Sequence, residues 1–387
     1  MERQTKEREE LYAKVHPPGD PIPINVEPSP VRDEVPEEPE IREKVIKLRN
    51  GRSGGAAKIR AEDIKQWLRG MIEEEEKGTE GAGDNWRLFV KLIQTIWRTG
   101  VLPQQMYWVI IVLIPKGGGD YRGIGLIEPF WKVIECIMDD RLNIIEFHDC
   151  LHGFLAGKGT GTATIEAKLS QQLAFIEQQP LYGVYIDLRK AYDAMDRDRC
   201  VLIMKAYGVG PNMLHLIENF WENAELVCRA NGRFGTPFKA HRGVTQGGPV
   251  SPKIFNIMVD AIFWEWIRQL VGEEAASEGL KDAIKLLLAI FYADDGYIAS
   301  RSKEQLQEAI DLLADLFDRV GLRTNTSKTK GMTCVTGKIR TRLPEEVYTN
   351  SRIGFHTQTA WNTRQVECDV CGEEMQAILG QSSGEIA

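Results

Sequence analysis

Two groups of aspartates interrupt segments that otherwise predict buried strands. Asp187 ends the apolar run at residues 181–187, and Asp294 and Asp295 follow the apolar run at residues 285–292. A carboxylate at the end of a buried strand is costly unless a cation or a hydrogen-bond donor meets it. Three hard oxygen ligands on a rigid sheet suit Mg²⁺. Two such ions, about 4 Å apart, can activate a 3′-hydroxyl and stabilise a leaving pyrophosphate.

The same aspartate pair also fits a plain turn. Residues 285–292 and 296–300 predict a hairpin whose turn contains Ala293, Asp294 and Asp295, and Asp is common in hairpin turns. Taken alone, these residues favour the turn. A shared site requires the two aspartate-bearing strands to lie side by side, because 107 positions separate Asp187 from Asp294.

The elements around these aspartates mix helices and strands irregularly. The run at residues 106–115 is apolar and β-branched, as in a buried strand, and a Gly-rich turn follows it. Helical spacing of apolar residues predicts helices at residues 130–147, 162–178, 252–271 and 303–320. This irregular alternation, with antiparallel hairpins, favours an α+β fold over a doubly wound sheet.

Six segments between residues 50 and 332 follow one another in a recognisable order. They are a Gly-rich segment at 50–56 and segments at 113–124, 185–193, 241–256, 291–295 and 321–329. A four-residue match such as Tyr-Ala-Asp-Asp arises by chance, but six segments in order are specific. Together they resemble the reverse transcriptase domain of non-LTR (LINE-like) retrotransposons, as its Gly-rich opening, its fingers motif and its motifs A, B, C and D.

The resemblance implies a polymerase right hand and a two-metal site. Its fold would have fingers and an antiparallel palm sheet flanked by helices, with a reduced or absent thumb. Asp187 and Asp294 would be metal ligands, Asp295 the third catalytic carboxylate, and the Leu188 carbonyl a backbone ligand. The cofactor would be Mg²⁺ or Mn²⁺.

The resemblance also implies a set of nucleotide-binding residues. The ring of Tyr192 would lie under the nucleotide sugar and exclude a 2′-hydroxyl. Glycine at position 247 allows the backbone to approach a ligand closely. Without the motifs, these side chains would be interpreted as a core aromatic, a polar turn and solvated charges. The full set is Lys116 and Arg122 at the triphosphate, Tyr192 at the sugar, Gln246 and Gly247 at template and nucleotide, and Lys328 as a proton donor near the pyrophosphate.

The charge distribution permits a polyanionic partner despite the net charge of −8. Residues 1–50 hold 12 acidic and 9 basic residues, and residues 71–84 hold 6 acidic residues and one basic residue, so these two segments supply the whole deficit. Residues 319–342 carry seven basic residues and no acidic one. Because phosphate contacts depend on local basic clusters, an RNA template with a DNA primer, and dNTPs, remain suitable partners.

The sequence predicts four regions. Residues 1–49 are charged, Pro-rich and expected to be largely disordered. Residues 50–180 would form the fingers and the start of the palm, and residues 181–332 the palm with its motifs. Residues 333–387 would be a basic and polar tail whose Cys368 and Cys371 resemble half of a zinc finger, expected to be metal-free.

Targeting signals are not predicted. The charged start lacks the apolar core of a secretory signal, and no apolar run approaches about 20 residues. We therefore expect a protein of the nucleus or cytoplasm, with reduced cysteines and no membrane contact. The oligomeric state is not indicated.

Three functions fit the motifs. RNA-directed DNA polymerase activity explains them all. A catalytically impaired retroelement fragment that only binds nucleic acid is the alternative, favoured by the short region after Lys330. A metal-dependent nuclease would explain the carboxylates but not Tyr192, Gln246 or Lys116.

Overall fold

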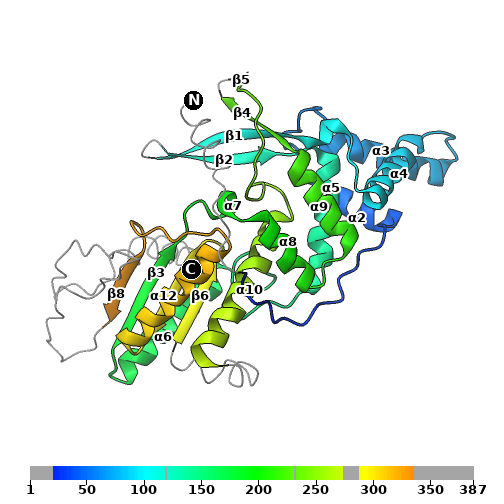
Figure 1. Ribbon diagram of the computed structural model, residues 1–387. Coiled ribbons are helices and arrows are strands. Elements are labelled where there is room, and N and C mark those ends of the chain that lie inside the picture. Colours follow the sequence, from blue (N-terminus) through cyan, green and yellow to red (C-terminus); the bar gives the residue numbers. More distant parts are fainter. Residues whose placement is uncertain (1–20, 118–119, 231, 273–286, 335–387) are drawn as a thin grey trace, which may run out of the picture.

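Two four-stranded sheets and the helices around them make up the described part of the chain, as Figure 1 shows. The computed structural model describes residues 21–117, 120–230, 232–272 and 287–334. Helices and antiparallel strands are mixed, so the α+β prediction is confirmed.

The first sheet has the strand order β2-β1-β4-β5. The β-branched run that predicted a strand forms its centre, where Val109 is fully buried. Strand β1 pairs antiparallel with β2 and parallel with β4. The strands are β1 (Trp108–Gly117), β2 (Asp120–Leu126), β4 (Glu225–Ala230) and β5 (Arg233–Phe234).

The second sheet is antiparallel, with the order β6-β7-β3-β8. Alternate side chains of β3 point to opposite faces: Ile186 is buried in the main core, whereas Tyr185 is 41% exposed. Asp187 shares the face of Tyr185, away from that core. The strands are β3 (Leu181–Asp187), β6 (Leu287–Tyr292), β7 (Asp295–Ser300) and β8 (Lys330–Cys334).

The helices begin at recognisable signals. Asp196 accepts a hydrogen bond from the Arg199 backbone N–H at the start of α8, and Ser302 does the same for Gln305 in α12. Proline stands in the first turn of α5, α9 and α10, where its missing N–H costs nothing. The helices are α2 (Glu38–Lys47), α3 (Ala61–Lys77), α4 (Asp84–Thr99), α5 (Pro129–Arg141), α6 (Thr160–Ile176), α7 (Ala191–Ala194), α8 (Arg197–Ala206), α9 (Pro211–Asn223), α10 (Ser251–Val271) and α12 (Lys303–Arg319), with 3₁₀ turns η1 (Gln104–Tyr107) and η2 (Leu142–Ile144).

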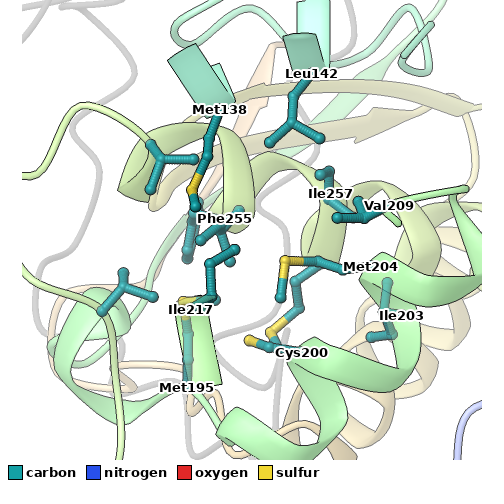
Figure 2. Packing of buried hydrophobic residues seen from close by; sticks show 14 of the residues in the cluster. Met138, Leu142, Met195, Cys200, Ile203, Met204, Val209, Ile217, Phe255 and Ile257 are labelled. Atoms are coloured by element: carbon teal, nitrogen blue, oxygen red, sulfur yellow. The ribbon is translucent and has the colours of Figure 1, made fainter. Parts of the chain in front are cut away.

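Helix α10 is the centre of the main core. Figure 2 shows its Phe255 and Ile257 among side chains from α5, α8 and α9, including Met138, Met204 and Ile217. Each of these side chains is at most 2% exposed. Burial of one such side chain stabilises the fold by roughly 1.5–3 kcal/mol, so α10 is a rigid support for the segments packed on it.

The prediction that residues 1–49 are largely disordered is wrong for residues 21–49. Helix α2 buries Ile41 and Val45 completely. Both Asp33 carboxylate oxygens accept hydrogen bonds from backbone N–H groups at the start of α9. Prolines keep the preceding segment extended, and its apolar residues pack on the core without needing a regular element.

Two other expectations lie outside the described residues. The tail with Cys368 and Cys371 falls there, and so does the region that bears on the thumb. Across the described helices, none is both long enough and apolar enough to cross a membrane.

Candidate active site

The predicted juxtaposition of the two aspartate-bearing strands is confirmed. Strands β3 and β7 are neighbours, and Asp187 and Asp295 are direct partners in their register. Directly opposite residues of an antiparallel pair project from the same face. Asp294 precedes Asp295 in the tight turn between β6 and β7. The sheet therefore gathers at one end three carboxyl-bearing residues from distant parts of the chain.

The loop before α6 fixes the position of the turn that bears Asp294. Ala293 has a φ of 56°, an unfavourable value for a residue with a Cβ. The loop before α6 lies against this turn: the Phe291 N–H donates to the Cys150 carbonyl at 2.7 Å, and the His152 N–H donates to the Phe291 carbonyl at 2.8 Å. Gly153 follows directly, and a Cβ there would lie 2.6 Å from the Ala293 nitrogen. The loop thus fixes the turn by close backbone contact.

The carboxylate of Asp187 is held by the segment after α12. The Asn325 side-chain amide donates to Asp187 Oδ2 at 2.7 Å, and the Asn325 backbone N–H donates to the Asp187 carbonyl at 2.7 Å. Lys328 Nζ lies 3.6 Å from Asp187 Oδ1, and its side chain is 66% exposed. The structure therefore pairs Lys328 with Asp187. The backbone of Leu188, the predicted carbonyl ligand, forms a bridge with Thr324.

Substitution of Asn325 tests this support. We expect Asn325→Ala to lower the rate of primer extension about 10- to 100-fold, because a hydrogen bond to a charged group contributes roughly 1.5–3 kcal/mol. The rate should be measured with the thermal midpoint of unfolding. Asn223→Ala, which removes an exposed amide that donates to the Asn219 carbonyl in α9, is the control. Wild-type rates in Asn325→Ala would contradict a role for Asn325.

Tyr192, in the short helix α7, packs against α10 next to the aspartate turn. Its ring stacks on Phe255 with the centroids 4.8 Å apart and the planes 14° from parallel. Its hydroxyl is buried and finds no hydrogen-bond partner among the described residues. Burial, and secondarily the negative charge of Asp294, raises the pKa of Tyr192. The ring is thus fixed by packing, and it is close enough to Asp294 for the two groups to interact electrostatically.

A loop joins Tyr192 to the first sheet. The Val244 N–H donates to the Tyr192 carbonyl at 2.8 Å, and the Gly125 N–H of β2 donates to the Gln246 carbonyl at 2.6 Å. Gly247 has a φ of 116°, and a Cβ there would lie 2.6 Å from the Gly125 carbonyl oxygen. Glycine is therefore required at position 247. The structure brings Gln246 and Gly247 to the same region as Tyr192.

A buried carboxyl lies behind this loop. Glu135 of α5 is 3% exposed, its Oε1 accepts a hydrogen bond from the Trp131 indole N–H at 2.7 Å, and its Oε2 has no partner among the described residues. A Cβ at position 248 would lie 2.5 Å from Oε2. Burial raises the pKa of Glu135 from 4.5 to about 7.

This carboxyl predicts a pH-dependent stability. The pKa of Glu135 is higher in the folded protein than in the unfolded chain. The free energy of unfolding therefore falls as the pH rises from about 4.5 through about 7. We expect Glu135→Gln to unfold with a free energy higher than wild type by about 1–2 kcal/mol at pH 8, with little difference at pH 4. Denaturant titrations at both pH values measure this. A constant difference between the two proteins would contradict it.

The two predicted triphosphate residues lie on the β1–β2 hairpin. Arg122 is exposed on β2 and pairs in register with Ile114. Lys116 is in the last part of β1, near an irregularity between Pro115 and Gly117, and its side chain lies outside the description. Among the described side chains, Arg122 forms no hydrogen bond or ion pair with the aspartates, so the place of Lys116 and Arg122 at a triphosphate stays a prediction.

The carboxylates of Asp187, Asp294 and Asp295 suit a divalent cation chemically, although their side chains do not form an assembled metal-binding group. Asp187 and Asp295 are opposite in register and Asp294 is adjacent, and carboxylate oxygens are the ligands that Mg²⁺ prefers. Within the described ranges, no group of three or more His, Cys, Asp or Glu side chains is positioned to hold a metal ion. Asp187 instead contacts Asn325 and Lys328.

Sequence reasoning missed three supporting residues. Asn325 belongs to motif D, but its bond to Asp187 needs the strand pairing to be known. Arg197 donates from Nε to the Gly243 carbonyl at 2.9 Å and from Nη1 to the Trp221 carbonyl at 2.8 Å, and so holds the base of the Gln246 loop. Glu135 gave one signal, an acidic residue in an apolar helix.

An antiparallel sheet with aspartates at one end, next to a packed tyrosine and a glycine-containing loop, has the arrangement of a polymerase palm. Residues 114–372 match the family model Reverse transcriptase (RNA-dependent DNA polymerase). The chain belongs to this family, so the predicted resemblance to a reverse transcriptase domain is confirmed. The family uses divalent metal ions.

Several relatives of the chain come from retrotransposons. The chain is 26% identical over 247 residues to the "Retrovirus-related Pol polyprotein from type-2 retrotransposable element R2DM" of Drosophila melanogaster, covering 62% of this chain and 23% of that protein. It is 23% identical over 241 residues to the "RNA-directed DNA polymerase from mobile element jockey" of Drosophila funebris, covering 59% of this chain and 25% of that protein. The resemblance to non-LTR elements is thereby confirmed. The chain spans about a quarter of the length of these two relatives.

A solved structure of "apo telomerase from Candida Tropicalis truncated from C-terminal domain" is similar to 66% of this chain and 56% of that chain, at 17% identity and a TM-score of 0.45.

Proposed function

We propose that this chain itself extends a DNA primer on an RNA template, using dNTPs. The observation that supports this most is the register pairing of Asp187 with Asp295, next to the turn that bears Asp294. In the reaction, the primer 3′-hydroxyl oxygen forms a bond to the α-phosphorus of the dNTP. The bond from that phosphorus to pyrophosphate breaks, and the 3′-hydroxyl proton passes to solvent water.

Each proposed residue has a task at a stated group. Asp187, Asp294 and Asp295, with the Leu188 carbonyl, would hold Mg²⁺ or Mn²⁺, which would lower the pKa of the 3′-hydroxyl and stabilise the leaving oxygen. Tyr192 excludes a 2′-hydroxyl by bulk. Lys116 and Arg122 offset the triphosphate charge, and Gln246 and Gly247 contact template and nucleotide. Lys328, now 3.6 Å from Asp187, donates a proton to the pyrophosphate.

The second candidate is a protein that binds nucleic acid without extending a primer. It is favoured by the contacts of Asp187 with Asn325 and Lys328, and by the lack of an assembled carboxylate trio in the described ranges. For polymerisation, the Asp187–Lys328 ion pair must open or rearrange when cation and nucleotide arrive. The exposure of the Lys328 side chain permits this movement.

Primer extension on poly(rA)/oligo(dT) separates the two candidates. The polymerase adds dTTP in the presence of Mg²⁺ or Mn²⁺ and stops when EDTA removes the ion. The binding protein shifts the same duplex in a gel and adds no nucleotide. Cleavage of the template without extension would instead indicate a nuclease.

A further inference from the structure

Helix α6 packs on the palm sheet through its small residues. Its Ala163, Ala167 and Ala174 belong to a small apolar cluster with Ile290 of β6 and Tyr297 of β7. Ala174 is fully buried. The face of α6 that meets the sheet is thus made of alanines.

The opposite face of α6 is apolar and large, yet it is in solvent. Ile165, Leu169, Leu173 and Ile176 are 59%, 51%, 51% and 72% exposed. Their spacings of four, four and three residues place them in one line along the helix, which we call the α6 stripe. A helix that packs once normally buries its large apolar residues. A helix with two apolar faces usually packs against a second partner as well.

Strand β8 ends near the C-terminal end of the α6 stripe. Strand β8 ends at Cys334, whose register partner is Leu181, the first residue of β3. Helix α6 ends at Ile176, only five residues before Leu181. Residue 335 therefore follows a strand that ends close to the C-terminal end of the stripe.

The remaining chain is long enough to cover the stripe. Eleven residues of helix separate Ile165 from Ile176, a distance of about 16 Å, which roughly five extended residues span. Fifty-three residues follow Cys334, among them Ile353, Phe355 and Trp361. A nucleic acid fits the stripe poorly, because its phosphates need basic partners and the stripe offers aliphatic side chains.

We propose that the α6 stripe is the docking surface for a segment of residues 335–387 of the same chain. The palm sheet then lies on one side of α6 and the C-terminal segment on the other. This inference goes beyond the proposed polymerase function and does not depend on it.

The test uses the full chain and hydrogen–deuterium exchange. We expect Leu169→Lys with Leu173→Lys to speed exchange at least tenfold in one or more peptides from residues 335–387, because the charges disrupt the apolar contact. Peptides of β3 and β7 should keep their wild-type protection. The matched control places two lysines at exposed leucines elsewhere, Leu88→Lys with Leu202→Lys, which are 65% and 52% exposed in the wild type. It should leave residues 335–387 unchanged.

A second variant covers the case in which the lysine pair unfolds α6. With p-benzoylphenylalanine at position 173, irradiation should give a cross-link within one chain to a peptide from residues 335–387. The proposal is overturned if those peptides exchange alike in wild type and in the lysine pair, or if the cross-link joins two copies. A wild-type dimer in sedimentation that the lysine pair dissociates would also overturn it, since the occupant would be a second copy.

Discussion

Replacement of Asp294 by Asn is expected to lower the rate of primer extension by at least about 10³-fold while the protein stays folded. Asp294 occupies the turn between β6 and β7, at the edge where Asp187 and Asp295 are paired. The amide keeps the size of the side chain but removes the charge that would hold a cation and stabilise the developing charge at the phosphorus. Steady-state incorporation of dTTP on poly(rA)/oligo(dT) measures the loss.

Two further measurements make this result specific. The thermal midpoint of unfolding of Asp294→Asn should stay within a few degrees of wild type. The variant should also still bind the poly(rA)/oligo(dT) duplex and shift it in a gel. Asp198→Asn, at an exposed carboxylate of α8, is the matched control and should extend primers at the wild-type rate. Primer extension by Asp294→Asn at more than a tenth of the wild-type rate would remove Asp294 from the catalytic set.

Replacement of Tyr192 by Val is expected to weaken discrimination against ribonucleotides about 10- to 100-fold, measured as the ratio of kcat/KM for dTTP and UTP. The Tyr192 ring is stacked on Phe255, which is fully buried in α10, so it cannot move aside for a 2′-hydroxyl. Valine removes most of that bulk. The change should be seen mainly in UTP incorporation, because the obstacle concerns the ribose alone.

Tyr192→Phe is the matched control for this experiment. The tyrosine hydroxyl has no hydrogen-bond partner among the described residues, so phenylalanine keeps the ring and its stacking. We expect the Tyr192→Phe variant to discriminate against UTP about as well as the wild type. If the Tyr192→Val variant also discriminates as the wild type does, Tyr192 is an ordinary packing residue. If Phe and Val weaken discrimination equally, the hydroxyl rather than the bulk is responsible.

The sequence predicted the palm well because its signals are local. Alternating burial in β3, the apolar strand before Ala293, and the turn residues around Asp294 each follow from a few neighbouring residues. The motifs added what periodicity cannot give, namely that residues 107 positions apart share a sheet. The pairing of Asp187 with Asp295 confirmed this part.

The supporting contacts could not be predicted, because they depend on tertiary distances. Lys328 was expected near a pyrophosphate, and its contact with Asp187 depends on how the segment after α12 crosses the end of β3. Composition suggested disorder for residues 21–49, but their scattered apolar residues find a preformed core. The unpartnered Glu135 oxygen and the exposed α6 stripe are likewise properties of packing, not of spacing.

The close backbone contact between Gly153 and Ala293 has a consequence for comparing genomic copies of related retrotransposons. A methyl group at position 153 would come within 2.6 Å of the backbone nitrogen that precedes Asp294. A genomic copy could therefore keep every catalytic signature and still be silenced by one Gly-to-Ala change outside all of them. An inventory of signature residues would count that copy as competent.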